Sequence, residues 1–247
     1  MPLPFPCHGG ARPGAGRTRK SERSRVSHKP RPRFAARHPL LVTIRLRSGL
    51  PSLRRKREFA LIRNRLRLAA ERFDVRLIEY SVQSNHAHLI VEAADERALA
   101  RAMKGLLVRI ARGLNRLWNR CGSVLDDHYH ARVLKTPREV RNALVYVLQN
   151  AHKHGVHLGG PDPCSSRLSF DGWKHLSRGA ISSTTSAFAR ARTWLLSVGW
   201  RKHGRIAISE RPARCRAVHS EMSSHSRRCA QLRLLESSTD GARHDHR

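Results

Sequence analysis

Acidic residues are scarce in this sequence. Its 247 residues include 18 Asp and Glu against 49 Lys and Arg, which gives a formal net charge of +31. A surplus of this size exceeds what solubility requires and indicates a polyanionic partner, most often nucleic acid. A basic disordered tail on a neutral enzyme explains only part of it, because arginines also crowd segments with helical periodicity. The composition therefore favours a nucleic-acid-binding protein over one that binds a membrane surface.

Long apolar runs, paired cysteines and a phosphate-binding loop are also missing. No apolar stretch approaches the ~20 residues that a membrane-spanning helix needs, and residues 1–20 lack the apolar core of a secretory signal. The five cysteines are scattered without a CxxC pair, which fits a reducing compartment better than a disulfide framework. No GxxxxGK[ST] motif occurs, so an ATP site is not expected. We therefore expect a cytoplasmic protein without a membrane association.

The distribution of apolar residues divides the chain into four parts. Residues 1–37 are rich in Pro, Gly, Arg and Ser, which predicts a disordered basic arm able to bind phosphates without reading sequence. Residues 38–155 carry regular apolar patterns and form the predicted domain. Residues 156–204 contain a few aromatic anchors and are expected to form a C-terminal extension packed on that domain. Residues 205–247 show no pattern and are predicted to be a disordered tail.

Two apolar periodicities follow one another along the domain. Alternating apolar residues predict four strands, over residues 40–46, 75–82, 85–92 and 124–134. Apolar residues at helical spacing predict two helices, over residues 52–72 and 96–118, the second capped by Asp95. The order is β-α-β-β-α-β, the ferredoxin-like arrangement with two helices on one face of a four-stranded antiparallel sheet.

A third helix is predicted after this set, over residues 136–155. Thr136 at the cap, Pro137 at the first position and Glu139 three residues after the cap form a strong helix start. Tyr146 and Asn150 are four residues apart, so they are expected to lie on one side of this helix. The predicted fold class is therefore α+β, a ferredoxin-like βαββαβ sheet with an added C-terminal catalytic helix.

The chemistry of this helix depends on two histidines in the third strand. His86 and His88 are two residues apart and therefore share one face of the strand. Two neutral imidazoles and the amide oxygen of Asn150 could hold a divalent metal, Mg²⁺ or Mn²⁺, that polarises a phosphate. Such help is needed because a tyrosine, with a pKa of about 10, is a poor nucleophile near neutral pH. Attack by Tyr146 on DNA would give a phosphotyrosine and release a hydroxyl, which can later reverse the reaction.

The other tyrosines are weaker candidates. Tyr129 lies between His128 and His130, and on a strand it would face away from both. Tyr80 lies within a predicted strand and has no polar partner at helical spacing. Basic residues flank these elements and are candidates for contact with DNA, while a solvated face for the arginines and a structural role for the two histidines stay open. They are Arg54, Arg55, Arg57, His128, His130, Arg132 and Lys153.

Three segments together carry a resemblance to a known family. They are QSNHAHLIV at residues 83–91, YHAR at 129–132 and NALVYVLQN at 142–150. They resemble the single-tyrosine HUH transposases with an IS200-like transposase domain, and most closely the REP-associated tyrosine transposases of bacteria. The resemblance spans roughly residues 38–155. Two departures are the small Ala87 between the histidines and Ala151, where relatives often have proline.

The resemblance implies a ferredoxin-like catalytic domain that cuts and rejoins single-stranded DNA through a 5′-phosphotyrosine. It implies that His86, His88 and Asn150 bind the metal and that Tyr146 is the nucleophile. The implied substrates are hairpin-forming repeats, and the implied setting is the bacterial nucleoid. Family members work as monomers or as homodimers, and the sequence leaves both open.

Three alternatives stay open beside an active transposase. A domesticated or inactive transposase would bind a DNA sequence or hairpin without cutting it. A metal-dependent nuclease would activate water in place of a tyrosine. An RNA-binding sheet would stack bases on aromatic side chains, but residues 85–92 contain no aromatic residue except the two histidines.

Overall fold

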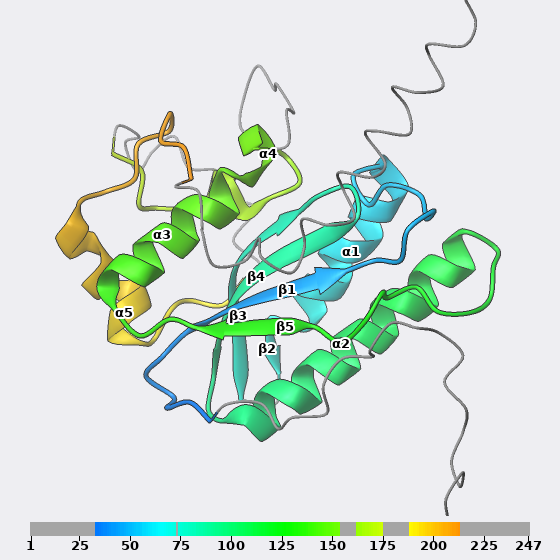
Figure 1. Ribbon diagram of the computed structural model, residues 1–247, viewed down its shortest axis with the longest axis horizontal. Coiled ribbons are helices and arrows are strands. Elements are labelled where there is room, and N and C mark those ends of the chain that lie inside the picture. The colour runs from blue at the N-terminus through cyan, green and yellow to red at the C-terminus, as the bar shows by residue number, and fades with distance from the viewer. Residues whose placement is uncertain (1–32, 73, 154–161, 175–187, 213–247) are drawn as a thin grey trace, which may run out of the picture. The chain divides into compact units, whose positions relative to one another are not determined.

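The computed structural model describes residues 33–72, 74–153, 162–174 and 188–212 (Figure 1). The predicted arm at 1–37 lies outside the described residues up to position 32, and the predicted tail at 205–247 lies outside them from position 213. Only two stretches of the predicted extension at 156–204 are described. Gly155, expected to end the third helix, also falls outside. All described residues belong to the second of the chain's two compact units, which begins at Arg33.

A five-stranded antiparallel sheet forms the centre of this unit. Its strands are ordered β2-β3-β4-β1-β5. The four main strands are β1 (Leu40–Arg45), β3 (Val75–Val82), β4 (His86–Ala93) and β5 (His130–Val133), and β2 (Glu71–Arg72) adds a two-residue edge. With the two intervening helices, the main strands confirm the predicted ferredoxin-like α+β fold.

Two helices cover one face of the sheet. They are α1 (Lys56–Leu68) and α2 (Glu96–Leu117), and they enclose the larger hydrophobic core. Asp95 caps α2 as predicted, because its Oδ1 accepts a hydrogen bond from the Ala98 N–H at 2.6 Å. Helix α1 begins four residues later than predicted. The preceding turn is held to the β3–β4 connection, where the Leu53 N–H donates to the Ser84 carbonyl at 2.8 Å.

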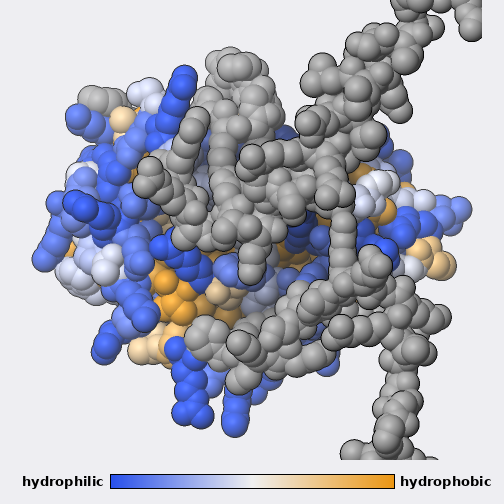
Figure 2. Space-filling view, in the orientation of Figure 1, coloured by the Kyte–Doolittle hydropathy of each residue, from blue (hydrophilic) through white to orange (hydrophobic). Residues whose placement is uncertain are grey.

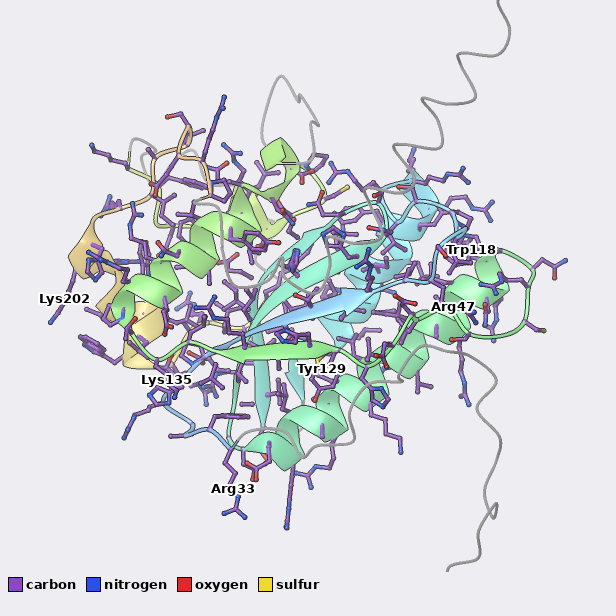
Figure 3. All side chains as sticks on the ribbon, in the orientation of Figure 1. Arg33, Arg47, Trp118, Tyr129, Lys135 and Lys202 are labelled. Carbon is purple, nitrogen blue, oxygen red and sulfur yellow. The ribbon has the colours of Figure 1, made fainter. Side chains whose placement is uncertain are left out.

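The last strand is shorter than the sequence predicts. We expected a strand over residues 124–134, whereas β5 starts at His130 and only an isolated bridge joins Leu46 to Leu125. Residues 126–128 are polar, so no side of that segment gains from burial, and it bends at the surface instead. We predicted that Tyr129 and His128 lie on one strand with their side chains on different faces, and this was wrong because both residues precede β5. Tyr129 nevertheless lies buried in the core toward α2 (Figure 3).

A third helix covers the opposite face of the sheet. Helix α3 (Pro137–Leu148) starts with the predicted capping box, in which Thr136 and Glu139 satisfy each other's backbone N–H groups. Its apolar side packs on Ile90 of β4 and forms a second hydrophobic core. Figure 1 shows α1 and α2 on one side of the sheet and α3 on the other.

The end of α3 differs from the prediction of one continuous helix over 136–155. The helix stops at Leu148, Gln149 is non-helical, and a separate short helix α4 (Asn150–Lys153) follows. Gln149 is fully buried, and its Nε2 donates to the carbonyls of Ala207 and Ile208 at 3.2 and 2.8 Å. These contacts with a distant segment override the local helical preference at this residue.

The described parts of the extension pack on the α3 side. They include the short helices η1 (Ser166–Ser169), α5 (Trp194–Ser197) and η4 (Gly199–His203). Trp173 and Trp200 are buried in the second core, as expected for aromatic anchors, whereas Trp194 is 51% exposed. Hydrophilic residues cover most of the described surface that is visible in Figure 2. No helix among the described residues has both the length and the apolar character needed to cross a membrane.

Candidate active site

The two histidines of β4 face α3, away from the larger core. Ala87 and Leu89 point into that core, so strand alternation turns His86 and His88 to the other face. Their ring centroids are 4.8 Å apart and the rings meet edge to face at 75°. His88 is only 5% exposed, whereas His86 is partly exposed. The strand therefore presents two imidazoles side by side, as the sequence predicts.

Each imidazole has its Nδ1 atom engaged by a neighbouring oxygen. The Nδ1 of His88 lies 3.0 Å from the Thr43 hydroxyl, and the Nδ1 of His86 lies 2.9 Å from the amide oxygen of Asn85. An amide oxygen only accepts, so His86 carries its proton on Nδ1 when the ring is neutral. The Thr43 hydroxyl can accept from Nδ1 of His88 or donate to it, and the tautomer with its proton on Nδ1 leaves the lone pair on Nε2. Metal-binding histidines are typically oriented by a second hydrogen bond of this kind.

Tyr146 contacts this histidine pair from α3. Its hydroxyl lies 3.2 Å from Nε2 of His88, and the two rings meet edge to face with centroids 4.9 Å apart. The side chain is partly exposed. Helix and strand, 58 residues apart in sequence, thus bring a phenol to a histidine whose other ring nitrogen is already oriented.

The remaining tyrosines are less suited to act as nucleophiles. Tyr80 is 4% exposed, and burial raises its pKa to about 12, which disfavours the phenolate. Tyr129 is 8% exposed and belongs to the core under α1 and α2, on the other side of the sheet. Tyr146 is the tyrosine that combines partial exposure with a histidine contact.

Asn150 is the most unusual polar residue near the end of α3. It is 0% exposed, and neither its amide nitrogen nor its amide oxygen has a hydrogen-bond partner among the described residues. Buried amides are almost always paired, so an orphaned one needs a specific explanation, such as an ion. The break at Gln149 places Asn150 in α4, so the prediction that Tyr146 and Asn150 belong to one continuous helix was wrong.

The donor set fits a divalent metal. No group of three or more His, Cys, Asp or Glu side chains gathers anywhere in the described part of the chain. A third protein ligand for His86 and His88 would therefore be of another type, and an amide oxygen such as that of the buried Asn150 is a candidate by its chemistry. Carbonyl-type oxygens suit Mg²⁺ and Mn²⁺, and imidazole nitrogens suit divalent transition metals.

A row of polar residues crosses the sheet at His88. Thr43 of β1 is paired with His88 on one side and with His130 of β5 on the other, and Ser81 of β3 is paired with His88. Directly opposite residues in an antiparallel sheet point to the same face. The exposed His130 therefore lies on the same face as His88, with Thr43 between them.

The other predicted DNA contacts lie at scattered places. Arg55 and Arg57 are exposed around the start of α1, and His128 is exposed in the bend before β5. Arg132 is 41% exposed beside Glu139, at 3.4 Å. Lys153 belongs to α4, but its side chain lies outside the described part of the structure.

Arg54 differs from its neighbours because its charge is compensated within the chain. Its guanidinium makes two hydrogen bonds to the buried carboxylate of Asp162, at 2.7 and 3.0 Å, and a third to the Val82 carbonyl. The bonds to Asp162 raise the pKa of Arg54 above its ordinary value. This ion pair ties the start of α1 to the extension.

Sequence reasoning missed three residues beside the histidines. They are Thr43 and Asn85, which orient the two rings, and Arg45, which is paired with His86 and exposed. The sequence contains a signal that could have identified Thr43 and Arg45. They alternate with the buried residues of the first strand, and the ferredoxin-like strand order places that strand beside the histidines. Asn85 carried no pattern of its own.

The chain is similar to known proteins only in comparisons with solved structures. No family model matches the chain, and no curated protein matches it either. The chain is similar to a REP-associated tyrosine transposase bound to a REP hairpin, with 14% identity, a TM-score of 0.46, and coverage of 57% of this chain and 82% of that one. It is also similar to a candidate transposase from Deinococcus radiodurans R1, with 12% identity, a TM-score of 0.35, and coverage of 56% and 100%. The function proposed below therefore depends on this chain's own side chains.

Proposed function

We propose that this protein is a transposase-like enzyme that cuts and rejoins single-stranded DNA through a 5′-phosphotyrosine on Tyr146. The observation that carries the proposal is the contact of the Tyr146 hydroxyl with Nε2 of His88, 3.2 Å away. This contact brings a phenolic hydroxyl to a pair of imidazoles whose Nδ1 atoms each face a neighbouring oxygen, which supports Tyr146 as the nucleophile. The net charge of +31 supports a polyanionic substrate.

In the proposed reaction, the phenolic oxygen of Tyr146 attacks a backbone phosphorus of the DNA. A bond from this oxygen to phosphorus forms and the bond from phosphorus to the 3′-oxygen breaks. The phenolic proton is lost to solvent, and the departing oxygen takes up a proton to become a 3′-hydroxyl. A later attack by a 3′-hydroxyl on the phosphotyrosine rejoins a strand. The number of phosphodiester bonds is conserved, so no ATP is consumed.

His86, His88 and Asn150 would hold a divalent metal, Mg²⁺ or Mn²⁺. Such an ion supplies a Lewis acid and a template for the phosphate oxygens. Thr43 and Asn85 keep the two imidazoles in the orientation that presents Nε2. Arg45 and His130 lie on the same face and add donors for the DNA backbone near the nucleophile.

Hairpin-forming single strands are the proposed substrates. A hairpin combines a duplex with an unpaired strand, and the protein has basic residues both on the site face and around the start of α1. A homodimer and a nucleoid-associated, bacterial setting remain parts of the proposal that follow from the family resemblance.

The test is a denaturing gel of protein incubated with labelled single-stranded hairpin DNA and Mn²⁺. We expect a denaturant-resistant protein–DNA adduct that disappears with a chelator and in His86→Ala. The control is His203→Ala, which removes an exposed histidine of η4 and should leave the adduct unchanged. Tight, salt-sensitive DNA binding without any adduct across hairpin substrates would instead favour an inactive transposase that only binds DNA. DNA cleavage without an adduct would favour a nuclease that activates water.

A further inference from the structure

A buried polar cluster lies at the junction of α3 and α4. Its centre is Gln149, which is 0% exposed and whose backbone, with φ −109° and ψ 12°, ends the helix before Asn150. Both ends of its side-chain amide are bonded. Its Oε1 accepts from Nη1 of Arg167 at 2.7 Å, and its Nε2 donates to the carbonyls of Ala207 and Ile208 at 3.2 and 2.8 Å. We call Gln149 and these three partners the clamp.

Arg167 connects the parts of this clamp. Its guanidinium is buried, its Nη2 donates to the Ile208 carbonyl at 3.1 Å, and the group lies over the Trp173 ring at 5.1 Å. The Trp173 Nε1–H in turn donates to the Arg167 carbonyl at 3.1 Å. A hydrogen bond from a charged donor is roughly twice as strong as one between neutral groups. Arg167 therefore fixes the side chain of Gln149 more firmly than a neutral partner would.

The clamp is important because Asn150 follows Gln149 directly. Figure 1 shows α4 as a separate short helix beyond the end of α3. Asn150 is fully buried, and neither polar atom of its amide has a hydrogen-bond partner among the described residues. Within this part of the chain, the position of the amide thus depends on the backbone before and after the residue. The buried Ala151 holds the following side, and Gln149 holds the preceding side. The clamp therefore helps to determine where the Asn150 side chain points.

A second arginine attaches the same distant segment to α3 at another place. Arg141 lies ~12 Å before Gln149 along the helix axis. Its guanidinium donates to the carbonyls of Gly204 and Arg205 at 3.0 and 3.4 Å and pairs with Glu210 at 2.6 Å. If the clamp only attached this segment, loss of either arginine would have the same consequences for the candidate site. The two arginines therefore allow attachment to be separated from positioning.

We propose that Arg167 is a positioning residue for the metal site: through Gln149 it holds the break between α3 and α4 that directs the Asn150 amide to the proposed ion. The inference rests on the proposed function, since it takes Asn150, His86 and His88 as the metal ligands. Arg167 itself contacts neither the metal nor the DNA in this arrangement. The described part of the extension is then needed for metal binding as well as for stability.

The test measures Mn²⁺ binding without DNA. Free Mn²⁺ gives an electron paramagnetic resonance signal that is lost on binding, and the binding counted is the part that His86→Ala removes. Arg167→Met keeps a long side chain and removes every donor of the guanidinium. It should weaken Mn²⁺ binding by about 10–100-fold, the usual cost of losing a group that orients a metal ligand. The matched control, Arg141→Met, makes the same substitution and should stay within about twofold of the wild type.

A double-mutant cycle tests whether Arg167 acts through Asn150. The titration is extended to millimolar Mn²⁺, because Asn150→Leu leaves the histidines as the protein ligands and binds the ion more weakly. Adding Arg167→Met to Asn150→Leu should cause less than about twofold further loss, since the ligand that Arg167 positions is already absent. A further loss as large as in the wild-type background would overturn the proposal, because Arg167 would then act on the histidines or on the whole domain.

Thermal unfolding in chelator controls for folding. Arg167→Met and Arg141→Met each remove arginine contacts to the same segment, so both should lower the Tm. If Arg167→Met does not fold, Arg167→Lys takes its place, because it keeps the charge and loses the planar fork that reaches two acceptors. Weaker Mn²⁺ binding is expected there too. Wild-type affinity in a folded Arg167 variant, or an equal loss in Arg141→Met, would overturn the proposal.

These binding measurements need no DNA, so the two proposals can fail separately. Mn²⁺ binding that requires His86 and Arg167, without any adduct from the wild type, would reject the proposed enzyme and keep the role of Arg167. An adduct from the wild type, together with Mn²⁺ binding that does not depend on Arg167, would reject only that role. A wild type without His86-dependent Mn²⁺ binding would reject the metal ligands and the role of Arg167 together.

Discussion

The hydroxyl of Thr43 on β1 lies 3.0 Å from Nδ1 of His88 on β4, directly across the strand pair. This contact engages one ring nitrogen of the buried imidazole, and the opposite ring nitrogen faces the Tyr146 hydroxyl at 3.2 Å. Residues of β1, β4 and α3 therefore meet at the imidazole of His88. Thr43 acts through His88 and is a positioning residue in the proposed reaction.

Replacing Thr43 with valine should slow adduct formation. Thr43→Val keeps the shape of the side chain and removes the hydrogen-bonding group, so His88 loses the partner that orients it. Loss of such a partner typically costs 10–100-fold in activity or metal affinity. The measurement is the initial rate of adduct formation with saturating hairpin DNA. Thr43→Ser should restore the rate to within a few-fold, whereas failure of serine to rescue would indicate that Thr43 matters only for packing.

Replacing Asn150 with leucine should separate metal binding from stability. The amide is buried and has no partner in the described structure, so an apolar side chain of similar size should leave the Tm in chelator unchanged or raise it. A metal that binds the native state raises the Tm, and this increase with Mn²⁺ should be lost in Asn150→Leu. A Tm several degrees lower in chelator would contradict the assignment, because it would show that Asn150 makes a structural hydrogen bond.

The free energy of unfolding should depend on pH because of Glu79. This residue is 8% exposed, its Oε2 has no partner among the described residues, and burial raises its pKa from 4.5 to about 8. Between these two values the folded chain holds a proton that the unfolded chain has lost, so the free energy of unfolding falls as pH rises, by up to ~1.4 kcal/mol per pH unit. The decline should end above about pH 8.

The measurement for Glu79 is urea unfolding between pH 4 and 9, with Glu79→Gln as the comparison. The variant has no group to ionise here, so its advantage over the wild type should grow from about pH 4.5 and level off near pH 8. Parallel pH profiles for the two proteins would show that Glu79 titrates normally in the folded state.

Glu92 should be important for attaching the extension. Its carboxylate pairs with Arg76 at 2.7 Å and accepts hydrogen bonds from the Arg192 N–H and from the N–H and hydroxyl of Thr193. Glu92→Gln leaves Arg76 without its counter-charge and should lower the free energy of unfolding by roughly 2–4 kcal/mol. Asp171→Asn, which breaks an exposed ion pair with Arg201, should cost under about 1 kcal/mol. Equal costs in urea unfolding would mean that burial at Glu92 is unimportant.

The parts of the fold that could be predicted from sequence depend on local patterns. The capping box at Thr136 and the cap at Asp95 were correct to the residue, because each involves only neighbouring backbone groups. The break at Gln149 could not be predicted, since its partners Ala207 and Ile208 are nearly 60 residues away. The same holds for Arg54, whose partner Asp162 is 108 residues away. Long-range polar contacts leave no periodic signal.

One irregularity in β3 could also not be predicted from the alternation of apolar residues. A register shift between Leu77 and Glu79 changes which residues face the larger core. Leu77 and Tyr80 both point into that core, although strict alternation would put them on opposite faces. The shift turns Glu79 toward α3, where its carboxyl is buried.

In the candidate site, the histidines and Tyr146 could be chosen by residue type and spacing. Thr43 could be found only from the order of the strands in the sheet.

The measurement that tests the central claim most directly is the mass of the peptide that carries the DNA. The adduct formed with hairpin DNA and Mn²⁺ is digested with nuclease and protease, and the modified peptide is sequenced by mass spectrometry. We expect a nucleotide attached through its 5′-phosphate to Tyr146, and no adduct from Tyr146→Phe under conditions where that variant still binds DNA. A nucleotide on Tyr129 or Tyr80, or an adduct that persists in Tyr146→Phe, would contradict the account.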